Sequence, residues 1–409
     1  MDCMQMMTPH IAWVGGSDRR LALFENLFPL ENGVTYNAYV ILDEKTALVD
    51  TVDNAIRQQF FENLRAALAG RPLDYLIINH MEPDHCAHIE DICRIWPEVK
   101  IVGNPKTFQM IRQFYRMDLA GRTLEVREGQ ELSLGRHTLR FYMAPMVHWP
   151  EVMFTYEAAE GILFSADAFG TFGGFTGNLF SDQLDYKALY LDETRRYYAN
   201  IVGKYGPQVL AALKKVEGLP ISLLCPLHGP VLRGGDIPLL LEKYARWAAY
   251  RPEKPGVVLA YASMYGNTEA AVQRLAGLLS QKGIQDLRIY DVSKTHCSFI
   301  IARAFQYSHL VLASPTYNMQ LYQGMETLVD DMARLNLQNR GAAVMGNGSW
   351  APAAHTLLQE KLAAMKNMDL VARPLVIRSA LGPEQKGELE DMAEALAASV
   401  REGAAAILG

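Results

Sequence analysis

Two patterns of apolar and polar residues run along the chain, namely short apolar runs and longer stretches of helical periodicity. In the first part of the chain, helical periodicity predicts helices at 54–68 and within 186–216. The apolar runs predict strands at 35–42, 46–52, 75–80, 138–145, 152–157, 161–167 and 221–230. Two strand-rich halves with interspersed helices favour a layered α/β fold, an αββα sandwich.

The second part of the chain alternates more regularly between strands and helices. Its strands are predicted at 257–261, 286–290, 309–313, 341–345 and 374–378, with helices between them and a last helix at 384–401. Alternating units of this size indicate a doubly wound parallel sheet. Pro252 and Pro255 bracket two charged residues just before the first of these strands. We therefore place a domain boundary near residue 252 and expect domains at 1–252 and 253–409.

Composition narrows the class of protein. Half of the 409 residues are hydrophobic and 21% are charged, which is typical of a soluble globular protein. The net charge of −6 argues against a general nucleic-acid surface. No apolar run reaches the roughly 18 residues of a membrane span, and the N-terminus lacks the basic region of a secretory signal. Five scattered cysteines without a CxxC pair fit reduced thiols, so we expect a cytoplasmic protein.

The stretch HMEPDHCAH at residues 80–88 concentrates side chains that can bind a metal. It follows a predicted strand, and Pro83 stiffens the loop. Three further apolar runs each end in one such side chain, His148, Asp167 or His228. A polar surface loop would explain one of these features but not the set. The spacing therefore predicts a metal site.

A second site is predicted at the sheet edge of the second domain. In LAYASMYGNTEAAV a strand is followed by a polar turn and a helix, whose N-terminus suits a phosphate. Thr268 as a simple helix cap is the alternative interpretation, and the absence of GKS or GKT disfavours a triphosphatase loop. The turns SPTYNMQ and NGSWAP follow strands at the same edge. They place Tyr317, Asn318 and Trp350 where a flat ring could stack and be hydrogen bonded.

The ordered set HxExDH, His, Asp, His resembles the metallo-β-lactamase superfamily and, more closely, the flavodiiron proteins. Zinc hydrolases of that superfamily generally have HxHxDH, with histidine where this chain has Glu82. The resemblance implies that His80, Glu82 and His148 hold one metal, that Asp84, His85 and His228 hold the other, and that Asp167 bridges them. Three carboxylates suit an iron pair, although ligand softness alone leaves zinc and manganese open.

The second domain resembles flavodoxin, with S-x-Y-G-N-T as its phosphate loop, and implies FMN. Family members commonly show Gly-Trp in the third loop, where this chain has Ser349-Trp350. The flavin-binding residues that the resemblance implies are Ser263, Met264, Tyr265, Gly266, Asn267, Thr268, Ser314, Pro315, Thr316, Tyr317, Asn318, Gly346, Asn347, Gly348, Ser349 and Trp350.

Three other residues near these motifs have expected roles outside the ligand set. We expect His88 to be a hydrogen-bond partner of the site or a solvated side chain. Cys86 is expected to fill space beside the site, and Cys225 to lie in the core. Many family members carry a pocket histidine early in the first domain, whereas the only histidine here before the motif is His10. The substrate preference therefore stays open.

The resemblance covers nearly the whole chain and implies an oxidoreductase. Reduced FMN would pass electrons to a diiron centre that reduces dioxygen to water or nitric oxide to nitrous oxide. With no appended donor module in the sequence, we expect an external donor, either rubredoxin or a reduced deazaflavin. Relatives form head-to-tail homodimers, and we expect a homodimer or homotetramer here. Three alternatives remain: a dizinc hydrolase fused to a flavodoxin module, a non-catalytic electron carrier, and a sensor of oxygen or nitric oxide.

Overall fold

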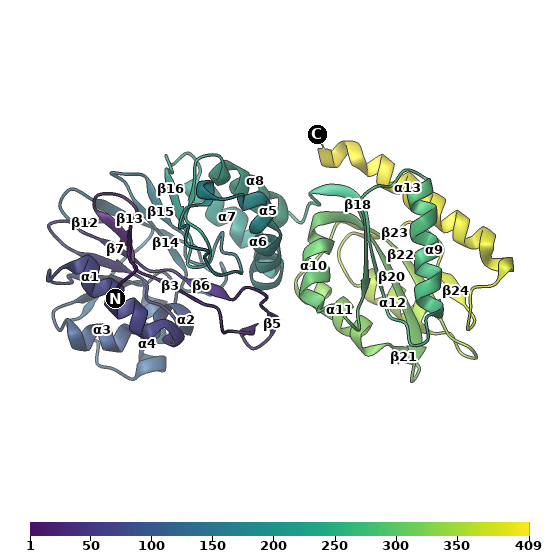
Figure 1. Cartoon of the computed structure of the whole chain (residues 1–409), viewed down its shortest axis with the longest axis horizontal. Coiled ribbons are helices and arrows are strands. Elements are labelled where there is room, and N and C mark those ends of the chain that lie inside the picture. Colours follow the sequence, from purple (N-terminus) through teal and green to yellow (C-terminus); the bar gives the residue numbers. More distant parts are fainter. Residues whose placement is uncertain (409) are drawn as a thin grey trace. The chain divides into compact units, whose positions relative to one another are not determined.

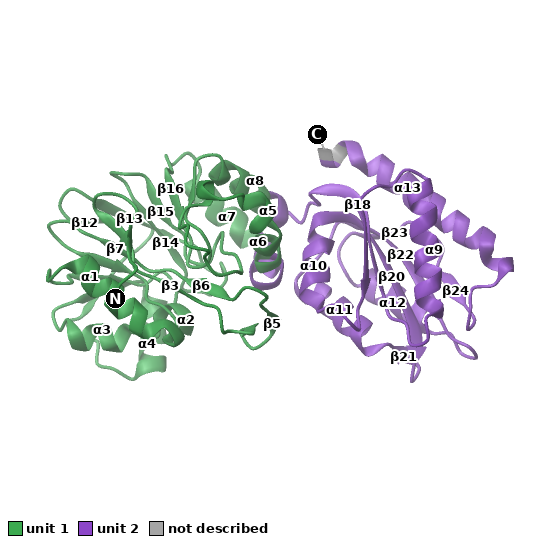
Figure 2. Cartoon of the chain, viewed as in Figure 1, with its two compact units in different colours: residues 1–198, 207–245 green, residues 199–206, 246–409 purple. Residues whose placement is uncertain are grey.

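The computed structural model describes residues 1–408, which fall into two compact units (Figure 2). The first joins Met1–Tyr198 to Pro207–Ala245, and the second joins Ala199–Gly206 to the chain from Arg246 onward. The domain boundary near residue 252 stays a prediction. Among the described residues, every helix is too short or too polar to cross a bilayer.

Two mixed sheets form the centre of the first unit (Figure 1). One has the order β1 (Gln5–Met6), β2 (Ile11–Trp13), β7 (Tyr39–Ile41), β8 (Ala47–Val49), β9 (Tyr75–Ile77), β10 (Lys100–Gly103) and β11 (Thr123–Glu125). The other has the order β12 (Glu131–Ser133), β13 (Thr138–Met143), β14 (Met153–Glu157), β15 (Ile162–Phe164), β16 (Leu223–Cys225) and β17 (Leu232–Arg233). Two small hairpin sheets pair β3 (Gly16–Asp18) with β6 (Val34–Tyr36), and β4 (Leu23–Phe24) with β5 (Phe28–Pro29).

The core of the first unit lies between these two sheets. Tyr39 and Phe164, one from each sheet, are buried with their ring centroids 5.1 Å apart. Burying an aromatic side chain of this kind contributes roughly 1.5–3 kcal/mol. The early helices are α1 (Arg57–Leu68), α2 (Pro83–Cys86), α3 (Ile89–Ile95) and α4 (Pro105–Tyr115), and the later ones are α5 (Tyr186–Leu189), α6 (Leu191–Tyr197), α7 (Gly206–Val216) and α8 (Asp236–Ala248). Figure 1 shows the two groups on opposite sides of the paired sheets, which confirms the αββα sandwich.

The predicted strand at 35–42 is wrong as a single element, because the chain breaks between β6 and β7. Asn37, fully buried at the break, donates from Nδ2 to the carbonyls of Pro226 and Gly229, both at 2.8 Å. Its backbone N–H donates to Leu227 O at 2.8 Å. Asn37 therefore holds in place the loop after β16, which carries His228.

The second unit is a parallel sheet with helices on both faces. Its strand order is β19 (Leu287–Asp291), β18 (Lys254–Tyr261), β20 (Tyr307–Tyr317), β22 (Arg340–Asn347) and β23 (Met368–Leu370), with β24 (Leu375–Ile377) also paired to β22. Helices α9 (Asn267–Gln281) and α13 (Lys386–Leu408) share one buried cluster with the sheet. Helices α10 (Cys297–Gln306), α11 (Gln323–Arg334) and α12 (Ala354–Ala363) lie on the other side (Figure 1). This confirms the doubly wound, flavodoxin-like sheet.

One predicted strand of this sheet ends well before the observed strand. The predicted strand at 309–313 is too short, because β20 runs on to Tyr317. Ser314 and Pro315 still pair with β22, and Thr316 and Tyr317 pair with the short strand β21 (Gln320–Leu321). The fifth predicted strand, at 374–378, agrees with β24, and β23 is an additional short strand that precedes it. Much of the second predicted loop is thus held by strand hydrogen bonds.

Candidate functional site

The structure brings together all seven side chains predicted to bind metal. They come from the loop after β9 and the start of α2, and from the loops after β13, β15 and β16. They form two groups, within each of which the candidate ligand atoms lie within 4.8 Å of one another. The first group is His80, Glu82, His148 and Asp167, and the second is Asp84, His85 and His228.

In the first group, two imidazoles converge on two carboxylates. His148 Nε2 lies 3.0 Å from Glu82 Oε2 and 3.1 Å from Asp167 Oδ2. His80 Nε2 lies 3.2 Å from Glu82 Oε2 and 3.5 Å from Asp167 Oδ2. Two imidazole nitrogens and two carboxylate oxygens therefore face one point.

In the second group, two imidazoles face one carboxylate. Asp84 Oδ2 lies 3.3 Å from His85 Nε2 and 3.4 Å from His228 Nε2, and the two nitrogens are 3.0 Å apart. Asp167 Oδ1 lies 3.1 Å from His85 Nε2. Asp167 thus presents a different oxygen to each group, which is the position of a bridge.

Several of these close contacts are not hydrogen bonds. Among the described residues, neither oxygen of Asp84, nor Asp167 Oδ1, nor His85 Nδ1 has a hydrogen-bond partner, although all four atoms are buried. Buried carboxylate oxygens without partners are costly. Ligand atoms about 2.0–2.2 Å from a common metal ion would themselves lie about 3 Å apart. The donor set therefore fits two metal ions that share Asp167.

Hydrogen bonds on the far side of two imidazoles fix their orientation. His228 Nδ1 donates to Thr35 O at 2.7 Å, which leaves the Nε2 lone pair facing the site. His80 Nδ1 donates to Glu151 Oε1 at 2.9 Å, and this oxygen also accepts from Met81 N at 2.8 Å. Glu151 is only 1% exposed. We did not predict it as a site residue, because one acid in a loop after Pro150 has no distinguishing spacing.

Asp50 positions the loop after β9. Its Oδ1 accepts from Asn79 N at 2.7 Å and from His80 N at 3.2 Å. Asp50 is fully buried at the end of β8, and burial raises its pKa to about 7 despite these bonds. We did not predict Asp50 as a site residue. A fixed loop backbone limits the movement of His80.

Close contacts within the cluster shift the pKa values of its acids and imidazoles. Burial disfavours the charged form of His148, but hydrogen bonds to Asp167 and Glu82 raise its pKa to about 9. Burial and the neighbouring His85 lower the pKa of His228 to about 4. Although burial opposes it, contact with His148 and His80 lowers the pKa of Glu82. Bound cations would replace the protons of these groups.

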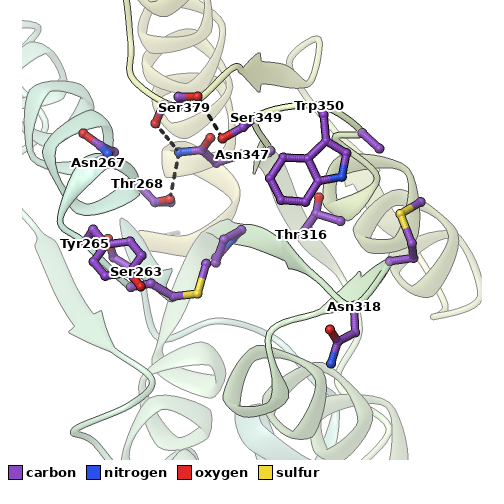
Figure 3. Close-up of a pocket in the computed structure, with 15 residues that line it drawn as sticks. Ser263, Tyr265, Asn267, Thr268, Thr316, Asn318, Asn347, Ser349, Trp350 and Ser379 are labelled. Atoms are coloured by element: carbon purple, nitrogen blue, oxygen red, sulfur yellow. Dashed lines mark hydrogen bonds between the residues drawn. The ribbon is translucent and has the colours of Figure 1, made fainter.

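A cavity of about 290 Å³ opens at the predicted flavin site of the second unit (Figure 3). Three loops line it, those after β18 and β22 and the end of β20, together with Ser379. Figure 3 shows the ring of Trp350 beside Thr316 at one side of the cavity and Tyr265 at the other. These rings are 87% and 91% exposed, so both are free to stack on a ligand.

Side-chain hydrogen bonds tie the loops around this cavity. Asn347 Nδ2 donates to Thr268 Oγ1 at 3.2 Å and to Ser379 O at 3.1 Å. Ser349 and Ser379 are joined through their hydroxyls at 2.8 Å. Gly266 has φ +88° at the cap of α9, and a Cβ there would meet open space. The start of α9 therefore offers N–H groups beside a bare backbone, an arrangement suited to phosphate.

Comparisons with known proteins identify the family of the chain. The family model "ODP family beta lactamase" matches residues 34–229. A nitric oxide reductase of Moorella thermoacetica is 33% identical over 371 residues, which cover 90% of this chain and 91% of that protein. The chain belongs to the flavodiiron protein family. A rubredoxin-oxygen oxidoreductase of Megalodesulfovibrio gigas is 30% identical over 375 residues, with 90% and 91% coverage.

Solved flavodiiron structures share the fold over almost the whole chain. The structure of rubredoxin oxygen:oxidoreductase from Desulfovibrio gigas superposes with a TM-score of 0.92 at 28% identity, and covers 98% of this chain and 99% of that one. The flavodiiron protein of Giardia intestinalis also gives a TM-score of 0.92, at 23% identity, and supports the fold alone.

In this flavodiiron chain a second cavity, of about 320 Å³, is lined in part by one residue from each metal group. Its lining includes Glu82 and Asp84 together with Glu25, which was not predicted. Glu25 is exposed at the tip of the β4–β5 hairpin, but its carboxyl turns toward the site. Burial of this carboxyl and the nearby Glu82 carboxylate raise the pKa of Glu25 to about 7. Glu25 has a φ of +51° in a turn that contains no glycine. The sequence therefore gave no sign of a turn at this position.

The other predicted residues of the flavodiiron sites lie as follows. Gly266, Ser314, Tyr317 and Gly346 adjoin the flavin cavity without lining it, whereas Met319, Ala351 and Ser379 line it without having been predicted. His88 stacks on Phe60 with ring centroids 5.8 Å apart, outside both metal groups. Cys86 is buried with Sγ 3.1 Å from Met81 O, and Cys225 lies in the core between the sheets.

Proposed function

We propose that this protein is a flavodiiron oxidoreductase that reduces nitric oxide to nitrous oxide, dioxygen to water, or both, at two iron ions, with electrons relayed through FMN. The observation that carries the proposal is the pair of ligand groups that share Asp167. Reduction of two NO to N2O and water takes two electrons and two protons. Reduction of O2 to two waters takes four of each. Both reactions need a centre that binds small molecules and a supply of electrons.

The seven side chains would hold the metals as the family resemblance assigns them. His80, Glu82 and His148 face one ion, and Asp84, His85 and His228 face the other. Four imidazoles and three carboxylates give a set richer in oxygen than that of the zinc hydrolases, which supports iron. Bound iron supplies a Lewis acid and a store of electrons.

The rest of the metal pocket would fix these ligands and exclude water. Glu151 and Thr35 hold the imidazoles of His80 and His228 so that each Nε2 faces the centre. Tyr197 is fully buried, and its ring centroid is 5.4 Å from that of His228. Burial and the nearby Asp167 carboxylate raise the pKa of Tyr197, so its hydroxyl stays protonated and would be able to donate a hydrogen bond in the metal pocket.

The cavity of the second unit would hold FMN. Its phosphate would lie against the start of α9, where Ser263, Asn267 and Thr268 border the cavity. The flat ring would lie near Trp350 and Thr316, whose hydroxyl accepts from Ala353 N at 2.9 Å and so cannot turn freely. FMN takes electrons singly or in pairs, and can therefore relay them from a one-electron donor.

The electron donor and the assembly are inferred here from the family resemblance. The name of the relative from Megalodesulfovibrio gigas specifies rubredoxin and oxygen, and that of the relative from Moorella specifies nitric oxide. We infer an external donor of the rubredoxin class, with a reduced deazaflavin as the alternative. We also infer a head-to-tail homodimer, or a tetramer built from it, in which the flavin of one subunit serves the metals of the other. Five free cysteines fit a reducing compartment, which supports a cytoplasmic location.

Turnover with each gas tests this function. Protein loaded with iron and FMN should consume NO, O2 or both when reduced rubredoxin is supplied, with FMN and two iron ions per subunit. A zinc-loaded sample of the same protein should bind FMN but consume neither gas, because zinc does not change its oxidation state. A sample that takes up only zinc, or that consumes neither gas when loaded with iron, would overturn the proposal.

A further inference from the structure

The cavity above the metal groups has a strongly one-sided charge. Its lining contains five carboxylates, those of Asp18, Glu25, Asp53, Glu82 and Asp84, and no lysine, arginine or histidine. Glu82 and Asp84 belong to the metal groups, so bound cations would offset their charge. The other three, Asp18, Glu25 and Asp53, are here called the acidic mouth.

Little in the structure neutralises the acidic mouth. Asp18 has Arg20 as a partner, with Arg20 Nε 3.6 Å from Asp18 Oδ1. The side chain of Arg20 is 82% exposed, and such pairs screen weakly. Asp53 accepts a hydrogen bond from Ala55 N at 2.7 Å and has no ion pair among the described residues. The mouth therefore keeps negative charge when the metal site is loaded.

The backbone holds Glu25 over the site. Leu27 N donates to Phe24 O at 2.9 Å and closes a turn in which Glu25 and Asn26 have φ of +51° and +54°. A left-handed glutamate costs free energy that glycine would avoid. Phe24 anchors this turn, since it is buried and its ring centroid lies 5.3 Å from that of His228. The hairpin is thus fastened to the site that Glu25 covers.

We propose that the acidic mouth is an anion-excluding gate, which lets neutral diatomic molecules reach the metals and discriminates against anions. This inference rests on the proposed function and specifies its substrate class. A fixed negative charge beside a narrow opening raises the free energy of an entering anion but hardly affects a neutral gas. The gate would also disfavour the carboxylate-bearing substrates of many lactam hydrolases.

The test uses the full chain loaded with cobalt(II), whose visible absorption reports ligand binding and does not depend on iron uptake. The anionic probe is azide and the neutral probe is hydroxylamine. Both are titrated at pH 8, at which azide is an anion and hydroxylamine is neutral. The variants are Glu25→Gln and the double variant Glu25→Gln/Asp53→Asn, in which Asn can still cap Ala55 N. Glu98→Gln is the matched control, because Glu98 is an exposed acid of the same unit outside the cavity lining.

We expect azide to bind about threefold more tightly to the single variant and about tenfold more tightly to the double variant. Hydroxylamine affinity should stay within about twofold in all proteins, and Glu98→Gln should match the wild type. In high salt the azide difference should shrink, because salt screens the gate. Equal azide affinity in the wild type and both gate variants would overturn the proposal. So would parallel changes for azide and hydroxylamine, which would indicate a disturbed site. Failure of iron uptake or gas turnover would count against the proposed function alone.

Discussion

Glu151 offers a sharp test of how the metal site is built, because it touches one histidine ligand and no metal-facing atom. Its Oε1 accepts from His80 Nδ1 at 2.9 Å and from Met81 N at 2.8 Å, while Oε2 has no hydrogen-bond partner in the part of the chain that the structure describes. In a Glu151→Gln variant the amide oxygen can keep both bonds. The charge that raises the basicity of His80 is lost, and the new amide N–H group is buried without an acceptor.

The expected losses of metal affinity and of folding stability follow from these contacts. Loss of a carboxylate partner behind a metal-binding histidine lowers metal affinity about 10- to 100-fold. That factor corresponds to about 1.4–2.8 kcal/mol. The unpaired amide should further lower the free energy of unfolding by about 1–3 kcal/mol. Only the metal held by His80, Glu82 and His148 should be weakened, because the second group makes no contact with Glu151.

Competition with a chromophoric chelator under anaerobic conditions should therefore resolve one weakened and one unchanged metal ion. Glu157→Gln is the matched control. Glu157 is equally buried near the same strand, and its two oxygens accept from Ala159 N at 2.7 Å and Glu160 N at 2.8 Å without touching a histidine. If Glu151→Gln binds both ions as tightly as Glu157→Gln does, the proposed role of the His80–Glu151 bond is wrong.

Three further predictions concern the two sites and the sheet of the second unit. Glu82→His should abolish gas turnover while leaving the flavin bound and the sample yellow, and retained turnover would remove Glu82 from the ligand set. Gly266→Val should weaken FMN binding, measured by flavin fluorescence, at least tenfold, because valine is strained at φ +88°. Riboflavin, which lacks the phosphate, should lose much less, and an equal loss would contradict a phosphate site there. His309 Nε2 bonds Ser399 Oγ at 2.9 Å, and burial lowers the pKa of His309 to about 4. In the unfolded chain His309 takes up a proton near pH 6.5, whereas in the folded state it does so only near pH 4. The free energy of unfolding therefore falls progressively as the pH drops from 6.5 toward 4. A His309→Gln variant should show a weaker pH dependence of urea unfolding over this range, and an unchanged dependence would exclude His309 as the cause.

The seven metal-facing residues could be predicted because each follows an apolar run that becomes a buried strand. The loop after β9 and the loop after β16 are almost 150 positions apart, yet both strand ends open on the same side of the sandwich. The sequence could not predict Asp50, Glu151 or Glu25 as site residues. Asp50 and Glu151 accept hydrogen bonds from backbone N–H groups of the metal-binding loop, and Glu151 also accepts one from the His80 imidazole. Neither position has a periodic spacing that would mark it in the sequence. Glu25 depends on a left-handed turn that lacks the glycine by which such turns are recognised.

Strand limits were predicted less well than strand positions, for a related reason. Tertiary contacts, and not apolar runs, decide where hydrogen bonding stops. Asn37 ends β6 because its side chain binds the loop that carries His228. Thr316 and Tyr317 stay in β20 because β21 supplies partners. Both differences from the predicted strand limits occur beside a functional loop, where contacts made by the folded chain override the local sequence pattern.

Mössbauer spectroscopy of protein loaded with iron-57 tests the central claim, that seven side chains hold two iron ions with Asp167 between them. For the oxidised protein we predict two high-spin ferric sites coupled to a diamagnetic ground state, and for an Asp167→Asn variant weakened coupling or loss of one iron. Magnetically isolated ferric ions in the wild type, or a single iron per subunit, would contradict the account.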